Sequence, residues 1–182
     1  MDKKKAKQVE TLETLWNNTA NLLDTAKSLL VSEQKVSYAF VLLQTASEEM
    51  GRIWALWLHF DGHKSVPVPP KDRHQEKHSY FIQFMSFEAV GHRTYYEIMS
   101  DIVGFKITKE NARYEKTLEK IQKFREKNLY VSINPSNNHV ISEPWENGTK
   151  EKQKLLQELY NLLAVYMRSM LRNLIQNYKR KK

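Results

Sequence analysis

Apolar residues recur at helical spacing along most of this 182-residue chain, and this periodicity restricts the fold more than any other feature. Only five glycines and five prolines are available to build turns, so the periodic segments have to be long. No run of apolar residues reaches the roughly 18 that a membrane span needs. The pattern therefore predicts an all-α protein, an antiparallel bundle of about five helices that each bury one stripe.

The same periodicity sets the bounds of the expected helices. Asp72 and Thr108 are suitable N-caps, because their side-chain oxygens can accept a hydrogen bond from a free helical amide. Asn128 to Trp145 lacks a helical period and contains two prolines, which favours a loop or short extended structure. The last helix is expected to be the longest. The predicted helices run from Val9 to Ser32, from Val36 to Phe60, from Asp72 to Val103, from Thr108 to Lys127 and from Thr149 to Tyr178.

No internal repeat and no linker divides the sequence, so we expect a single domain over residues 1–182. Residues 1–8 and 179–182 are basic and are expected to be flexible tails. The chain has no cysteine, which excludes disulfides, thiolate metal sites and cysteine nucleophiles. The first residues lack the apolar stretch of a signal peptide, so we expect a cytoplasmic protein without membrane contact.

The formal net charge of the chain is +8 at pH 7. A charge of this size favours polyanions, because lysines and arginines that neutralise phosphates release condensed counterions. Part of the excess lies in the two tails, where a solvated basic run needs no specific partner. Charge alone therefore makes nucleic acid a candidate partner. The alternative, that part of the charge only belongs to solvated tails without a specific partner, stays open.

Polar groups on stripes that a bundle has to bury are the best candidates for function, because an unpaired polar group in the core costs free energy. Glu48, Glu49 and Arg52 meet this condition on the second predicted helix. Glu49 follows Ala46 by three residues and precedes Ile53 by four, so it borders the buried face. The simpler interpretation is a helix salt bridge from Glu48 to Arg52, spaced i,i+4 and worth about 0.3–0.5 kcal/mol.

Two histidines, His74 and His78, lie one turn apart at the start of the third predicted helix. Such a pair can share a metal, but the sequence signals no third or fourth ligand, so we predict neither a metal nor a cofactor. A histidine that faces a polar pocket, for acid–base chemistry or for contact with phosphate, is the preferred interpretation. Arg73 and His78 also form an Arg-x4-His pattern, a spacing that arises easily by chance in a basic chain.

The fourth predicted helix carries an arginine on its apolar face. The predicted row consists of Tyr114, Leu118, Ile121 and Arg125. Arg125 needs an acidic partner or a phosphate oxygen there, and its planar guanidinium suits either. An ion pair with one of the two neighbouring glutamates of the second helix is the structural alternative. Tyr130, just beyond the predicted helix, can add its hydroxyl to the same place.

Three stretches of the sequence resemble the AbiV family in the right order. Ala39 to Arg52, with the sequence AFVLLQTASEEMGR, resembles the family's alanine-rich helix that ends in Glu-Glu-x-Gly-Lys, with Arg52 in place of the lysine. His74 to Lys77 resembles the family's His-x-x-Lys element, and Phe124 to Val131, with the sequence FREKNLYV, resembles its Arg-x-x-x-Leu-Tyr-Val element. The likeness extends over roughly Leu12 to Val131.

The resemblance implies a fold and a function. AbiV proteins are associated with abortive infection, in which an infected bacterium stops growing before phage can spread. They are grouped with the HEPN superfamily, helical bundles that often dimerise and often cut RNA without metal. We therefore expect a HEPN-like homodimer that acts on RNA, with a phage or host protein as its trigger. Tyr130 stands where the superfamily's Arg-x4–6-His motif has its histidine.

The resemblance also implies a role for each candidate residue. In a ribonuclease of this kind the ribose 2′-hydroxyl attacks the adjacent phosphate, His74 carries the proton, and Arg125 with Lys77 stabilises the charged phosphorane. The alternative is a non-catalytic interaction protein, whose polar cluster locks the bundle and whose last helix docks a partner. The predicted catalytic residues are Glu48, Glu49, His74, Arg125 and Tyr130, and the predicted RNA- and phosphate-binding residues are Arg52, Lys77, Arg73 and His78.

Overall fold

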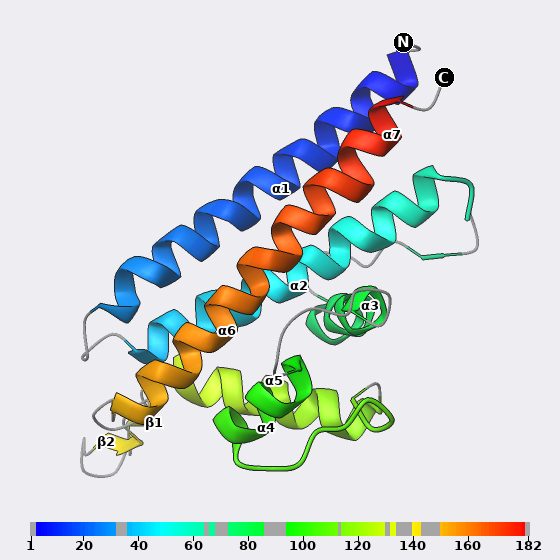
Figure 1. The fold of residues 1–182 in the computed structure, drawn as a ribbon. Helices are drawn as coiled ribbons and strands as arrows, with labels where there is room; N and C mark the ends of the chain where they lie inside the picture. The colour runs from blue at the N-terminus through cyan, green and yellow to red at the C-terminus, as the bar shows by residue number, and fades with distance from the viewer. Residues whose placement is uncertain are drawn as a thin grey trace.

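A computed structural model of the chain confirms the predicted all-α fold (Figure 1). The structure describes residues 3–31, 36–63, 66–67, 73–85, 94–112, 114–129, 132–133, 140–142 and 150–180. In these residues a short antiparallel ribbon pairs β1 Ser132–Ile133 with β2 Val140–Ser142, inside the stretch predicted to be loop or short extended structure. The helical elements are α1 Lys3–Leu30, α2 Val36–Phe60, α3 His74–Met85, α4 Tyr95–Val103, α5 Glu115–Leu129, α6 Lys150–Ser169, the π-helical η2 Met170–Ile175 and α7 Gln176–Arg180.

Three long helical stretches run side by side across the molecule (Figure 1). The first two are α1 and α2, and the third is α6 with η2 and α7, which follow one another without a break from Lys150 to Arg180. This third stretch is the long last helix that the sequence predicts. α1 runs opposite to the other two, and α3 crosses them and is seen nearly end-on, while α4 and α5 lie on the same side as α3.

The segment from Asp72 to Val103 was predicted to form a single helix, the third. It contains two helices, so that prediction was wrong. α3 ends at Met85 and α4 begins after Thr94, whose extended backbone (φ −77°, ψ 158°) cannot continue an incoming helix. Thr94 forms a capping box with Glu97: each side chain accepts a hydrogen bond from the other residue's backbone amide. Gly104 ends α4 in the left-handed conformation (φ 74°), as a helix-terminating glycine should.

The fourth predicted helix begins later than expected, at Glu115 of α5 instead of Thr108. The Thr108 amide donates to Asn111 Oδ1 at 2.9 Å and the Asn111 amide donates to Thr108 Oγ1 at 3.3 Å, so the threonine closes an isolated turn. Tyr114 consequently precedes the helix and is 63% exposed, and its predicted place on the buried row was wrong. Leu118 and Ile121 are buried as predicted.

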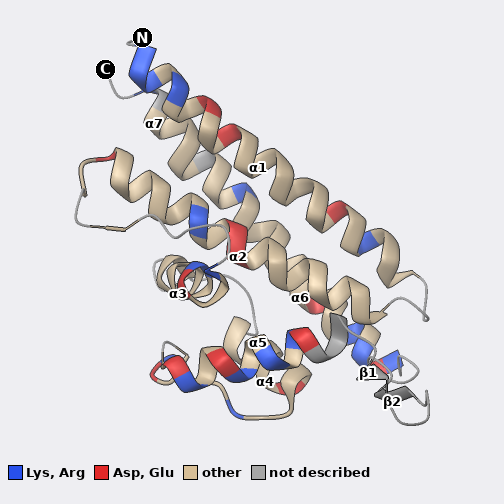
Figure 2. Cartoon of the chain, turned by 180° about the vertical axis from the view of Figure 1, so that it is seen from behind, with Lys and Arg blue, Asp and Glu red and all other residues tan. Residues whose placement is uncertain are grey.

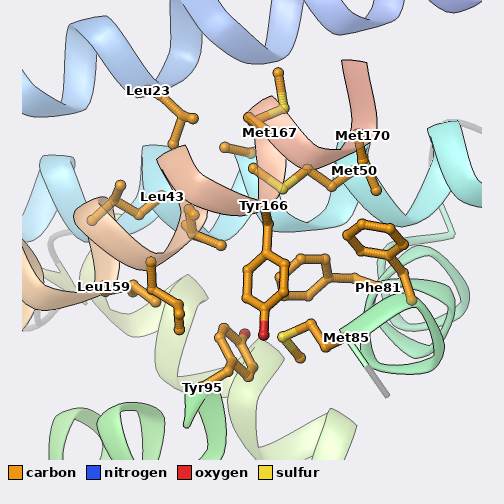
Figure 3. Close-up of a cluster of buried hydrophobic side chains, with 14 of the residues drawn as sticks. Leu23, Leu43, Met50, Phe81, Met85, Tyr95, Leu159, Tyr166, Met167 and Met170 are labelled. Carbon is orange, nitrogen blue, oxygen red and sulfur yellow. The ribbon is translucent and has the colours of Figure 1, made fainter. Parts of the chain in front are cut away.

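The core lies between the three long helical stretches and α3 and α4 (Figure 3). α2 is central to it, because it packs against α1, α3, α5 and α6. Its inward-facing apolar residues are buried from Ala39 to Trp54. No helix in the described part of the chain is long and apolar enough to span a membrane. The buried side chains labelled in the close-up are Leu23, Leu43, Met50, Phe81, Met85, Tyr95, Leu159, Tyr166, Met167 and Met170.

The first residues of the predicted basic tail are part of a helix. α1 begins at Lys3, ahead of the predicted start at Val9, and its first turns lie beside α7 at one end of the molecule (Figure 1). The hydroxyl of Tyr178 donates to Gln8 Oε1 at 2.8 Å and joins the two elements. The two ends of the described chain are therefore neighbours.

Candidate functional site

The buried carboxylate of Glu48 joins side chains from three helices. Glu48 lies on the inner face of α2, with 2% of its side chain exposed. Nδ1 of His74, at the start of α3, lies 2.7 Å from Glu48 Oε2, and Nη1 of Arg125, on α5, lies 3.6 Å from Oε1. The structure thus brings together three of the predicted catalytic residues, and we call Glu48, His74 and Arg125 the Glu48 cluster. The ion pair that was the structural alternative for Arg125 is present as well.

Arg125 keeps part of its donor capacity. Its Nη2 donates to Thr45 Oγ1 at 3.3 Å and its Nη1 donates to Gln122 Oε1 at 3.4 Å, while its Nε is buried and has no hydrogen-bond partner among the described residues. These distances and the 3.6 Å to Glu48 are longer than a charge-assisted hydrogen bond of about 2.8 Å. The side chain of Arg125 is 11% exposed, and its guanidinium has several distant acceptors and no close one among the described residues.

Glu49 forms a second ion-pair group next to the Glu48 cluster. It accepts a hydrogen bond of 2.8 Å from Lys77 Nζ, and Arg52 Nη1 lies 3.6 Å away. Arg52 therefore pairs with Glu49 at i,i+3, and the predicted alternative of an i,i+4 bridge to Glu48 was wrong. Lys77 is 3% exposed, so its ammonium neutralises Glu49 inside the protein, and the phosphate contact predicted for it is not accessible in this conformation.

Gly51 explains how α3 comes close enough to α2 to make both groups. A Cβ built on Gly51 would overlap the carbonyl oxygen of Lys77 and lie 2.6 Å from the amide nitrogen of Phe81. The backbones of the two helices therefore touch, and any larger residue would separate them. The glycine of the Glu-Glu-x-Gly pattern thus positions His74 and Lys77 over the two glutamates.

His78 lies in the core instead of at the site, which corrects its predicted contact with phosphate. Nε2 of Gln44 donates to His78 Nδ1 at 2.7 Å, His78 Nε2 lies 3.3 Å from the Tyr95 hydroxyl, and that hydroxyl lies 3.4 Å from Gln44 Oε1. Burial lowers the pKa of His78 from 6.5 to about 4 and raises the pKa of Tyr95. With both ring nitrogens engaged, His78 cannot share a metal with His74, nor meet a phosphate beside Arg73.

His74 is the member of the Glu48 cluster that reaches solvent, with 34% of its side chain exposed. It lines a cavity of about 340 Å³ between α3 and α5. Arg73 stands at the same cavity, largely exposed and 3.5 Å from Glu76, where it can still meet a ligand. The lining of this cavity is Arg73, His74, Gln75, Glu76, Gln122 and Glu126.

Tyr130, the remaining predicted catalytic residue, lies outside the described residues. Within the described ranges no three histidine, aspartate or glutamate side chains lie close enough together to hold a metal ion.

The sequence interpretation missed several residues that shape the site, among them Gln44, Thr45 and the packing role of Gly51. A signal was available for two of them. Thr45, Glu49 and Arg52 follow i,i+4,i+7 spacing and form one polar row on α2, and Gln44 precedes Glu48 by four residues. The partners of that row on α3, α4 and α5 are distant in sequence, so only the structure shows them.

The protein is an all-α bundle with a charged cluster between its helices. HEPN-type proteins belong to this class. The family model described as AbiV, a HEPN type, matches residues 9–164, most of the chain, so the protein belongs to the AbiV family. Membership indicates a HEPN-type function in abortive infection, the anti-phage response expected from the sequence. No curated protein and no solved structure matches the chain.

Proposed function

We propose that this AbiV-family protein is an abortive-infection effector that acts on RNA as a metal-independent endoribonuclease, with the Glu48 cluster as its active site. One observation carries the proposal: the 2.7 Å contact of Glu48 with Nδ1 of His74. Because a carboxylate only accepts hydrogen bonds, Nδ1 carries a proton in this contact, and Nε2 is the ring nitrogen left to exchange a proton with a substrate. His74 also lines a cavity, so this nitrogen is available to a substrate.

The geometry supports a transfer reaction within one RNA strand. The ribose 2′-oxygen forms a bond to the adjacent phosphorus while its proton moves to Nε2 of His74. The bond from phosphorus to the 5′-oxygen of the next nucleotide breaks, and that oxygen takes a proton from His74 or from water. The products are a 2′,3′-cyclic phosphate and a 5′-hydroxyl end. Glu48 is a positioning residue in this scheme, because it fixes the tautomer and orientation of the ring and stabilises its protonated form.

Two arginines supply positive charge at this site. Arg125 has an unpartnered Nε and only long contacts, so it can turn toward a phosphate whose charge grows in the transition state. Arg73 is exposed at the cavity and can bind a neighbouring phosphate. Glu76 and Glu126 also line this cavity and repel phosphate, so RNA needs a further basic surface to be held.

The test is His74→Ala beside His63→Ala, an exposed histidine three residues beyond α2 that serves as the matched control. Both variants should keep the melting temperature of the wild type, because Glu48 retains Arg125 when His74 is lost. Total RNA incubated with purified protein in the presence of EDTA should be cleaved by the wild type and by the control variant. His74→Ala should lose about 100-fold or more in rate, the usual contribution of a proton carrier.

The outcome decides between this proposal and a non-catalytic interaction protein, which the burial and internal pairing of Lys77 favour. Equal RNA patterns for the wild type and His74→Ala, together with intact growth arrest after phage infection in both, would rule out the catalytic role of the cluster. The homodimer, the cytoplasmic location and the phage or host trigger stay predictions.

A further inference from the structure

The positive charge of this protein is concentrated in the two ends of its chain. Residues 1–8 and 168–182 contain ten lysines and arginines and one acidic residue, which gives them a formal charge of +9. The whole chain has a formal charge of +8, so residues 9–167 together carry −1. Residues 9–167 therefore have no net positive charge, and the long-range attraction of a polyanion is directed to the ends of the chain.

The fold joins the first turns of α1 and α7 into one surface. α1 begins and α7 ends at the same end of the molecule (Figures 1 and 2). The Tyr178 hydroxyl on α7 donates to Gln8 Oε1 on α1 at 2.8 Å, and Lys5 Nζ lies 5.7 Å from the centre of the Tyr178 ring. We call this surface the basic pole. Its described cations are Lys3, Lys4, Lys5 and Lys7 of α1 and Arg180 of α7.

A groove runs from the basic pole toward the Glu48 cluster. It lies between α1 and α2 and has a volume of about 660 Å³. Lys7 lies at its end nearest the basic pole, and Thr45, which accepts a hydrogen bond from Arg125, lines its α2 wall. The lining residues are Lys7, Glu10, Thr11, Thr14, Leu15, Asn18, Thr45, Glu49 and Arg52.

The groove offers both donors and acceptors. Thr11, Thr14 and Thr45 each donate their hydroxyl proton to a carbonyl of their own helix at 2.8 Å, so toward a ligand these oxygens act as acceptors. Arg52 contributes its guanidinium, with 19% of the side chain exposed and Nη1 3.6 Å from Glu49. Glu10 is an acid in the lining that disfavours phosphate inside the groove.

We propose that the basic pole and the α1–α2 groove together form the docking surface for a single RNA strand. The lysines of the pole bind its phosphates, and the groove receives ribose hydroxyls and base edges, whose donors match the threonine oxygens and whose acceptors match Arg52. This inference rests on the proposed function and names the surface that holds the RNA for it. A strand laid from the pole along the groove reaches Thr45, whose hydroxyl accepts a hydrogen bond from Arg125 of the Glu48 cluster.

The pole is tested with the triple variant Lys3→Gln, Lys4→Gln and Lys5→Gln. The matched control is Lys116→Gln, Lys120→Gln and Lys123→Gln on α5, which removes the same charge from another exposed face. Each set includes one lysine over an aromatic ring, Lys5 over Tyr178 and Lys120 over Phe105. Binding of a short fluorescent oligouridylate is measured over a series of salt concentrations, and circular dichroism verifies that all variants fold.

We expect the pole variant to bind about tenfold more weakly at physiological salt, and the slope of log K against log salt to fall by about 2. Each phosphate contact of a single strand contributes about 0.7 to that slope. The α5 control should bind like the wild type. An unchanged pole variant, or an equal loss in both variants, would overturn the basic pole as the docking surface.

The groove is tested with Thr14→Trp, which fills it from α1, beside Thr25→Trp. Both threonines are exposed on α1 and donate to a backbone carbonyl four residues earlier, but Thr25 is not part of the groove. Thr14→Trp should weaken binding of the oligouridylate about tenfold with an unchanged salt slope, because no phosphate contact is lost. Thr25→Trp should have no effect, and equal binding by both variants would overturn the groove as part of the surface.

The experiments separate this inference from the proposed function. If the wild type does not bind RNA at all, the RNA-directed function fails and the docking surface fails with it. If the wild type binds and cleaves RNA while the pole and groove variants bind equally well, only the docking surface is overturned.

Discussion

The buried carboxylate of Glu48 contacts two side chains of different chemistry. His74 Nδ1 is close, at 2.7 Å, and Arg125 is more distant, at 3.6 Å. A carboxylate with so little exposure is stable in its charged form only while a partner of opposite charge remains beside it. Glu48 therefore has a structural role and a positioning role at once, and the two can be separated because His74 is partly exposed and Arg125 is not.

Glu48→Ala should destabilise the protein by about 3–5 kcal/mol, because the buried guanidinium of Arg125 loses its charged partner. Urea denaturation followed by circular dichroism measures this free energy. Glu126→Ala, which removes an exposed carboxylate from α5, should change stability by no more than about 0.5 kcal/mol. A Glu48→Ala loss as small as that of the control would show that Arg125 does not depend on Glu48.

His78 makes the stability of the protein depend on pH. Its pKa is about 4 in the folded protein and 6.5 in the unfolded chain, so below pH 6.5 the unfolded state binds more protons. Its contribution to stability is complete above pH 6.5 and is lost as the pH falls toward 4, in total roughly 3 kcal/mol. Protonation would also place an N–H of the ring against the amide donor of Gln44.

His78→Gln should remove this part of the pH dependence. The measurement is the free energy of unfolding in urea at pH 7 and at pH 4.5, for the wild type, His78→Gln and the exposed His63→Gln. The wild type and His63→Gln should lose more stability on acidification than His78→Gln does. Identical pH profiles for all three proteins would contradict the assignment to His78.

At the scale of elements, the site depends on how closely α3 crosses α2. The crossing is set by Gly51, where the two backbones touch. Glu48 and Glu49 are neighbours on α2, and the first turn of α3 provides a partner for each of them, His74 and Lys77. Small displacements of α3 therefore break both contacts together.

Gly51→Ala should separate the two helices. Overpacking of this kind costs about 1–3 kcal/mol, which exceeds the gain of up to about 1 kcal/mol from the better helix propensity of alanine. RNA cleavage should also fall, because His74 moves away from Glu48. Gly104→Ala is the control: it strains a left-handed residue (φ 74°) at the end of α4, a helix that contributes no residue to the Glu48 cluster. It should cost about 1–2 kcal/mol and leave cleavage intact.

The sequence predicts which segments of this bundle are helical better than it predicts where one helix ends and the next begins. The stripes of α1, α2 and the long last stretch fix their buried faces, because helical periodicity depends only on local sequence. The break before α4 was missed although Thr94 and Glu97 form a recognisable capping-box pattern, since apolar residues on both sides of it keep one helical phase. An ion pair of Arg125 with a glutamate of α2 was the alternative that polar residues on buried stripes offered. The choice of Glu48 as the partner of both Arg125 and His74, and the closeness at Gly51, need coordinates.

At the scale of the whole molecule, the net positive charge and the proposed catalytic residues lie in different parts of the chain. The ends of the chain carry the net positive charge, whereas the Glu48 cluster lies in a body with a formal charge of −1. Attraction of a polyanion is long-ranged and depends on salt, but proton transfer needs contact with His74. The two functions can therefore be weakened independently, by substitutions at the pole and at the cluster.

The basic pole exists because α7 is held against α1, so loosening that contact should weaken RNA binding without any change of charge. Tyr178 is buried there, and its hydroxyl contacts Gln8 and the carbonyl of Phe60. Tyr178→Phe should cost about 1 kcal/mol and Tyr178→Ala about 3 kcal/mol. Hydrogen exchange should rise in α7 and in the first turns of α1, more in the alanine variant.

Affinity for the fluorescent oligouridylate should follow the same order, wild type above Tyr178→Phe above Tyr178→Ala, since separated charges hold a strand less tightly than neighbouring ones. The differences should shrink at high salt, where screening removes the contribution of the pole. Faster exchange in α7 with unchanged affinity would mean that the lysines of α1 bind RNA without α7, and that the basic pole consists of one helix only.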